Sequence, residues 1–157
     1  MTIISMPEEG SIAPAFSGTV QGGETISLDD FKGKKLALYF YPRDNTSGCT
    51  KQACNLRDNY ESLGAEGIAI VGVSDDSIES HVKFAKSQNL PFPLIADTER
   101  SILNSYGVYG EKNMYGRKYM GTKRVTFLID ENRVIRKVFK KPKVIDHAAE
   151  IIMGFSD

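Results

Sequence analysis

Buried strands are predicted wherever a short run of apolar residues lies between residues that favour turns. A strand covered on both faces is apolar at nearly every position, and two such runs around a tight turn form a hairpin. The predicted strands are residues 15–20, 24–28, 35–41, 67–74, 94–96, 124–129 and 133–139. Three residues separate the first two strands and three separate the last two, which predicts two antiparallel hairpins.

Helices are predicted where apolar residues recur at intervals of three and four positions. The predicted helical segments are residues 27–33, 49–63, 77–88, 97–107 and 143–153. In the longest segment the shared apolar face carries Cys49, Ala53, Leu56, Tyr60 and Leu63. The faces expected to point inward in the third and the last segment are Ile78, Val82 and Ala85, and Ile145, Ala148, Ala149 and Ile152.

The order of these elements predicts an α/β fold with a mixed central sheet flanked by helices and an N-terminal β-hairpin. Because no internal repeat or linker interrupts the 157 residues, we expect a single domain over residues 1–157. Residues 108–122 are rich in Gly, Tyr and Met and are expected to form a long loop. In this loop Tyr115, Tyr119 and Met120 either line a site or pack on their own domain.

Composition and charge exclude several classes of function. Hydrophobic residues make up 41% of the chain and charged residues 25%, which is typical of soluble globular proteins. The formal net charge is zero, so we expect no nucleic-acid partner. The first ten residues lack the basic start and apolar run of a signal peptide, and no apolar stretch approaches the roughly 18 residues that span a bilayer. We therefore expect no membrane association, a cytoplasmic location and thiols that are reduced at rest.

The first candidate for chemistry is Cys49, which opens the longest predicted helix directly after a buried strand and a polar loop. Backbone N–H groups at a helix N-terminus, together with the helix dipole, favour a thiolate over a thiol, so the pKa of Cys49 is expected to fall. Ligands bind at the carboxyl ends of strands in open α/β sheets. Both features predict a reactive cysteine.

The second cysteine, Cys54, follows five residues later and about 140° around the same helix. It is expected off the apolar face, near Lys51, Asp58 and Glu61. In an intact helix the two cysteine Cα atoms lie roughly 8–9 Å apart, whereas a disulfide needs less than about 7 Å. The two thiols can therefore react with each other only if the first turns of the helix unwind.

Other uses of the two cysteines have little support in the sequence. His81 and His147 lie far from them in the chain and do not complete a metal-binding pattern, so no metal is expected. No CxxC dithiol motif occurs, and neither a GxGxxG nor a P-loop follows any strand, so no nucleotide or other cofactor is expected.

The segment PRDNTSGC at residues 42–49 fits the peroxiredoxin pattern P-x-x-x-T-x-x-C. With the five-residue step to Cys54 and the segment RVTFLID that begins at Arg124, the chain resembles the bacterioferritin comigratory protein (peroxiredoxin Q) subfamily of the peroxiredoxins. The resemblance covers nearly the whole chain. Two departures occur: Ser47 replaces a frequent proline, and Val125 replaces a small polar residue.

The resemblance implies a thioredoxin-like fold and a peroxidase that acts on hydrogen peroxide and organic hydroperoxides. Cys49 would be the peroxidatic nucleophile, and Cys54 the resolving thiol that forms a Cys49–Cys54 disulfide. Thr46 would hydrogen-bond the peroxide or the thiolate, Arg124 would stabilise negative charge, and Pro42 would fix the loop and shield the thiolate. Thioredoxin or a similar dithiol protein would reduce the disulfide, no cofactor would be required, and the protein would be a monomer.

Two other functions use the same sequence features. A peroxide sensor that passes oxidation to a partner would need the same residues, so only turnover with a reductant separates it from a peroxidase. A non-enzymatic thioredoxin-like binding domain would have inert cysteines and slow alkylation near neutral pH. The combination of Thr46, Cys54 and Arg124 disfavours this last possibility.

Overall fold

The structure is a computed structural model that describes residues 6–156. Its centre is a five-stranded mixed sheet with the strand order β5-β4-β3-β8-β9. The strands are β3 (Lys35–Phe40), β4 (Ile68–Ser74), β5 (Leu94–Ala96), β8 (Val125–Ile129) and β9 (Ile135–Phe139). The first three run parallel to one another, and β8 and β9 pair antiparallel. The predicted α/β class and mixed sheet are therefore confirmed.

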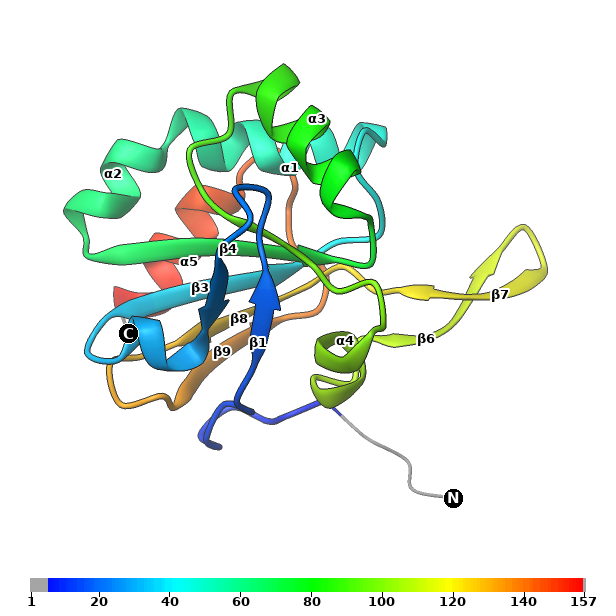
Figure 1. Cartoon of the computed structure of the whole chain (residues 1–157). Coiled ribbons are helices and arrows are strands. Elements are labelled where there is room, and N and C mark those ends of the chain that lie inside the picture. The colour runs from blue at the N-terminus through cyan, green and yellow to red at the C-terminus, as the bar shows by residue number, and fades with distance from the viewer. Residues whose placement is uncertain (1–5, 157) are drawn as a thin grey trace.

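One face of the sheet is covered by helices, which in Figure 1 lie along one side of the molecule and behind the sheet. The helices are α1 (Ser47–Asp58), α2 (Tyr60–Ala65), α3 (Ile78–Gln88) and α5 (His147–Ser156). All four contribute to one apolar cluster with the side chains of β3 that point to this face, among them Tyr39. Cys49 belongs to the same cluster, so the candidate nucleophile lies where α1 packs on the sheet.

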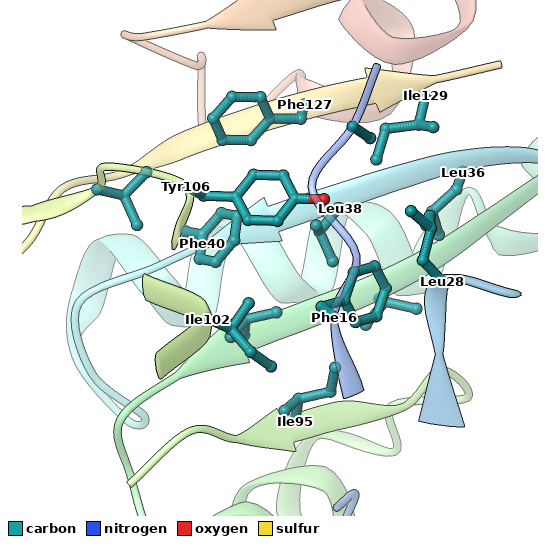
Figure 2. Close-up of a cluster of buried hydrophobic side chains, with 14 of the residues drawn as sticks. Phe16, Leu28, Leu36, Leu38, Phe40, Ile95, Ile102, Tyr106, Phe127 and Ile129 are labelled. Carbon is teal, nitrogen blue, oxygen red and sulfur yellow. The ribbon is translucent and has the colours of Figure 1, made fainter. Parts of the chain in front are cut away.

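The opposite face of the sheet is covered by the N-terminal hairpin and two short helices. These elements are β1 (Ser17–Thr19), β2 (Thr25–Ser27), the 3-10 turn η1 (Leu28–Phe31) and α4 (Ser101–Ser105). Figure 2 shows Phe16 and Tyr106 packed with Phe40 and Phe127 of the sheet. Both predicted hairpins, β1–β2 and β8–β9, are confirmed.

The single long helix predicted over residues 49–63 is not observed. The segment forms two helices, which are separated at Asn59. The Asn59 side chain donates to the carbonyl of Asn55, and its backbone has ψ 16, which ends the first helix. The apolar face consequently does not continue to Tyr60, which is 38% exposed.

The inward faces of α3 and α5 also differ from the prediction. In α3 the buried residues are His81 and Phe84, while Val82 is exposed. The prediction is confirmed for Ala85, which packs partly buried against the apolar cluster. His81 points inward because both of its ring nitrogens have hydrogen-bond partners in the interior. In α5 the buried residues are His147, Ala148, Ile151 and Gly154.

The predicted starts of α5 and α4 and the predicted inward face of α5 are also wrong in part. Helix α5 begins at His147, after Ile145, so Ile145 lies outside the helix and is exposed; Ala149 is exposed as well. Helix α4 begins at Ser101 and not at Asp97. The carboxylate of Asp97 instead accepts from the backbone N–H of Leu103 and the hydroxyl of Ser101, and so organises the turn before the helix.

The segment 108–122, predicted as a loop, is a β-hairpin that projects from the body of the molecule in Figure 1. Its strands are β6 (Tyr109–Met114) and β7 (Arg117–Thr122). The turn residues Tyr115 and Gly116 have φ of 53° and 79°, as a two-residue hairpin turn requires. Most side chains of the hairpin are exposed, so the alternation of buried and exposed positions that indicates a strand is missing.

Candidate active site

The candidate nucleophile lies at the first turn of α1, as predicted. Strand β3 ends at Phe40, residues 41–46 form a loop, and Thr46 is the N-cap with extended backbone at φ −82° and ψ 155°. Cys49 is the third residue of the helix and is 2% exposed. Cys49 therefore belongs to the first helical turn, whose N–H groups have no partner within the helix.

Arg124 is the cation that faces this sulfur. Its Nη2 lies 3.3 Å from Cys49 Sγ, and its Nη1 donates to Gln52 Oε1 at 2.7 Å. The two residues are 75 positions apart in the chain, and the antiparallel pairing of Phe40 with Val125 brings Arg124 beside the end of β3. The guanidinium therefore places a fixed positive charge and a hydrogen-bond donor directly beside the sulfur.

Gln52 is the residue of this site that the sequence analysis missed. It is completely buried, and it lies one helical turn after Cys49 on nearly the same face. Its Oε1 holds one arm of the Arg124 guanidinium while the other arm faces Cys49. The sequence feature that could have identified Gln52 is a polar residue three positions after the cysteine, on a helix face that is otherwise apolar.

A cavity of about 530 Å³ opens above this group and is lined by Pro42, Thr46, Gly48 and Arg124. The Thr46 hydroxyl donates to the carbonyl of Arg43 at 2.9 Å, which leaves its oxygen free to accept a hydrogen bond. The four predicted residues Pro42, Thr46, Cys49 and Arg124 are thus brought together by the fold. Whether each has the expected role remains a prediction.

The projecting hairpin forms one wall of the cavity. Tyr119 and Met120 line the cavity, so of the two predicted alternatives these side chains follow the one in which they line a site. Tyr115 is fully exposed at the tip of the hairpin. Lys112 also lines the cavity and donates to the carbonyl of Thr122 at 3.0 Å. Partial burial lowers the pKa of Lys112, and the charge of Arg124 lowers it further. The cavity is lined by four basic side chains and one carboxylate, so positive charge predominates around it.

The loop that carries Thr46 is anchored by the buried carboxylate of Asp44. Its Oδ1 accepts from the Tyr41 hydroxyl at 2.6 Å, and its Oδ2 accepts from Ser80 at 2.8 Å and lies 2.7 Å from His81 Nδ1. The Asp44 N–H donates to Asp76 at 2.9 Å. Asp44, Asp76 and His81 bring potential metal ligands within 4.8 Å of one another. These same groups form the hydrogen-bond network, which accounts for their proximity without an ion.

Cys54 lies in the same helix as Cys49, and both cysteines are free thiols. Cys54 is partly buried, and its Sγ lies 3.3 Å from Oε1 of Gln88 on α3. Gln88 is thus a neighbour of Cys54 that the spacing along the helix did not indicate. The second half of α1 is also bonded to distant parts of the chain. Asn55 donates to the carbonyl of Ile145 and accepts from the N–H of Ala148, and Arg57 donates to the carbonyl of Gln88.

The arrangement is that of a thiol-based redox site on a thioredoxin-like fold. The AhpC/TSA family model matches residues 10–138. A putative peroxiredoxin bcp of Coxiella burnetii is 48% identical over 92% of this chain and 96% of its own, and peroxiredoxin Bcp of Bacillus subtilis is 44% identical over 96% of each. The chain therefore belongs to the AhpC/TSA family, among the peroxiredoxins of the Bcp and peroxiredoxin Q group, which are thiol-dependent peroxidases.

A solved structure of the bacterioferritin comigratory protein of Xanthomonas campestris, studied for its alkyl peroxide reduction activity, is similar in fold. It is 32% identical with a TM-score of 0.83, and the match covers 90% of both chains. This likeness confirms the predicted fold class. Within residues 6–156, no helix has the length and apolar character needed to cross a membrane.

Proposed function

We propose that Cys49 is the peroxidatic nucleophile of this thiol peroxidase, with Thr46, Arg124 and Pro42 completing its site. The observation that carries the proposal is the 3.3 Å contact between Cys49 Sγ and Nη2 of Arg124, a residue that lines the cavity. The alkyl peroxide reduction studied in the Xanthomonas campestris protein supports organic hydroperoxides as substrates, in addition to hydrogen peroxide.

In the first step the Cys49 thiolate attacks one oxygen of the peroxide. An S–O bond forms while the O–O bond breaks, so that the sulfur is oxidised to a sulfenic acid and the peroxide is reduced. The leaving oxygen departs as an alkoxide or hydroxide and takes a proton from water. Arg124 stabilises the charge that develops on this oxygen, and Thr46 accepts a hydrogen bond from the peroxide.

In the second step Cys54 attacks the sulfenic acid of Cys49. The S–S bond forms, the S–O bond breaks, and the hydroxyl leaves as water with the proton of the Cys54 thiol. Because both cysteines lie in the intact helix α1, this step requires the first turns to unwind. Thioredoxin or a similar dithiol protein then reduces the disulfide and is itself oxidised. The proposed enzyme is monomeric and cytoplasmic, and it is built as one domain over residues 1–157.

The experiment that tests this function is an intact-mass measurement with a thiol count after one equivalent of hydrogen peroxide. The natural chain should lose both thiols and remain monomeric, whereas Cys54→Ser should stop at a sulfenic acid on Cys49. Cys49→Ser serves as the control and should keep its single thiol. Persistence of both thiols in the natural chain would contradict the proposal.

Repeated turnover with a dithiol reductant provides the second readout. A peroxidase consumes many equivalents of peroxide per chain when thioredoxin and its reductase are present. A chain that is oxidised once and then passes the oxidation to another protein would instead be a peroxide sensor, and its peroxide consumption would stop at one equivalent.

A further inference from the structure

Three buried polar groups in the part of the chain that the structure describes have no hydrogen-bond partner. They are the Tyr39 hydroxyl, Gln52 Nε2 and Thr122 Oγ1. Folded proteins contain few such groups, and each calls for an explanation. All three lie around the candidate active site: Gln52 binds Arg124, Thr122 lines the cavity, and Tyr39 packs in the same apolar cluster as Cys49.

Tyr39 is the least expected of the three. Its side chain projects from near the carboxyl end of β3 into the cluster that contains Cys49 and Ala53 of α1, and it is 1% exposed. The ring is stacked on Tyr41 at 5.4 Å between centroids and meets the ring of Phe92 edge-on at 6.0 Å. Burial raises the pKa of the Tyr39 hydroxyl, and the negative charge of Cys49 raises it further.

A phenylalanine would fill the same apolar space without burying an unpaired hydroxyl. Leaving a buried hydroxyl unpaired costs roughly 1–3 kcal/mol. The other two fully buried tyrosines avoid this cost, because Tyr41 donates to Asp44 and Tyr106 donates to the carbonyl of Pro14, each at 2.6 Å. The hydroxyl of Tyr39 thus lacks a partner in the form with two free thiols, which this structure represents.

We propose that Tyr39 is a positioning residue for the disulfide form of the enzyme, in which its hydroxyl donates a hydrogen bond to an oxygen acceptor that formation of the disulfide sets free. The proposal rests on the proposed function. The acceptors of this kind in the disulfide form are the backbone carbonyls that lose their partners when the first turns of α1 unwind.

The position of Tyr39 suits this task. Strand β3 lies in the middle of the sheet, with β4 on one side and β8 on the other, so Tyr39 keeps its place while α1 rearranges above it. A donor that is unpaired in one state and paired in another favours the second state by the difference in free energy. Tyr39 therefore favours the Cys49–Cys54 disulfide over the dithiol.

The test is the variant Tyr39→Phe, which removes only the hydroxyl. Gln52 and Thr122 are less suitable because Gln52 also holds Arg124 and the backbone of Thr122 holds Lys112. The matched control is Tyr106→Phe, which removes a buried hydroxyl that has a partner on the opposite face of the sheet. For each chain we would measure the disulfide–dithiol equilibrium in a dithiothreitol redox buffer, and the unfolding midpoint of both forms.

Tyr39→Phe should lower the equilibrium constant for disulfide formation by about tenfold, which corresponds to about 30 mV for a two-electron couple. Its reduced form should unfold at a temperature no lower than that of the natural chain, while its oxidised form unfolds earlier. Tyr106→Phe should lower both midpoints and leave the equilibrium unchanged. An unchanged equilibrium constant in Tyr39→Phe would overturn the proposal.

A second measurement uses the natural chain and does not depend on a variant. Tyrosine labelled with ¹³C at Cζ reports whether the Tyr39 hydroxyl is hydrogen-bonded, through its chemical shift in the reduced protein and in the disulfide form. The resonance should move in the disulfide form, and a resonance that keeps its reduced position there would contradict the proposal. A chain that forms no disulfide with peroxide would instead contradict the proposed function, before Tyr39 is tested.

Discussion

The imidazole of His81 lies 2.7 Å from the carboxylate of Asp44, although 37 residues separate them in the chain, and both side chains are buried. The other ring nitrogen, Nε2, lies 2.9 Å from the carbonyl of Ile95. Because a carbonyl only accepts, Nε2 donates to it, and Nδ1 faces the Asp44 carboxylate. This buried pair joins the loop before Cys49 to α3 and β5.

Removing one partner of the pair should therefore be costly. Asp44→Ala leaves His81 and the hydroxyls of Tyr41 and Ser80 without their acceptor, and we expect a loss of about 3 kcal/mol in the free energy of unfolding. Urea unfolding of the reduced protein measures this loss. The matched control is Asp58→Ala, whose exposed ion pair with Arg57 should contribute less than about 1 kcal/mol. Equal effects of the two variants would contradict the assigned role.

Arg124 should not be replaceable by lysine. A lysine ammonium cannot reach Cys49 Sγ and Gln52 Oε1 at the same time, as the two arms of the guanidinium do. We expect Arg124→Lys to lower kcat/KM for hydrogen peroxide by roughly 10²-fold or more. Stopped-flow oxidation of Cys49 measures this rate. Arg117→Lys, an exposed cation on the hairpin, is the control and should keep the natural rate.

Two glutamines should separate the two chemical steps. Gln52→Leu removes the group that orients Arg124, so we expect oxidation of Cys49 by peroxide to slow by about tenfold. Gln88→Leu removes the contact to Cys54 Sγ, so it should leave peroxide oxidation unchanged and speed disulfide formation. Rapid mixing followed by thiol trapping resolves the steps. If both variants slow the same step, this assignment is wrong.

Oxidation should loosen only the first part of α1. The backbone amides of residues 47–54 should exchange faster in the disulfide form, because these turns unwind when the two sulfurs meet. Residues 55–58 should stay protected, since Asn55 is bonded to Ile145 and Ala148, and Arg57 to Gln88. Hydrogen exchange read by mass spectrometry compares the two forms. Identical profiles would show that no unwinding accompanies the disulfide.

His147 should make the protein less stable in mild acid. Burial lowers the pKa of His147; the carboxylate of Glu150 opposes this shift, and the charge of Arg124 adds to it. An unfolded histidine titrates near pH 6.5. Below that value, and down to the lower pKa of the folded state, the unfolded chain binds more protons, so stability falls as the pH falls.

The variant His147→Gln should weaken this dependence on pH. The natural chain should lose up to about 1.4 kcal/mol per pH unit through this one group as the pH falls through the window below 6.5. Urea unfolding at pH 7.5 and 5.5 gives the difference for each chain. A variant with the same difference as the natural chain would show that His147 does not titrate on unfolding.

The sequence by itself determined the elements whose signals are local. Apolar runs such as residues 67–74 are covered on both faces, and the placement of Cys49 at a helix start follows from the polar loop before it. The motif at residues 42–49, with Cys54 and Arg124, indicated the family. Local signals failed where polar residues are buried, as at Gln52 and His81, because their partners come from distant parts of the chain.

Only the tertiary structure decided how these residues meet. Strand pairing between β3 and β8 places Arg124 beside Cys49, and the packing of α3 places Gln88 beside Cys54. The sequence likewise does not indicate that the Tyr39 hydroxyl is unpaired, because it shows only a tyrosine within a predicted buried strand. Contacts across the sheet depend on the register of several elements at once, and a single run of residues does not encode that register.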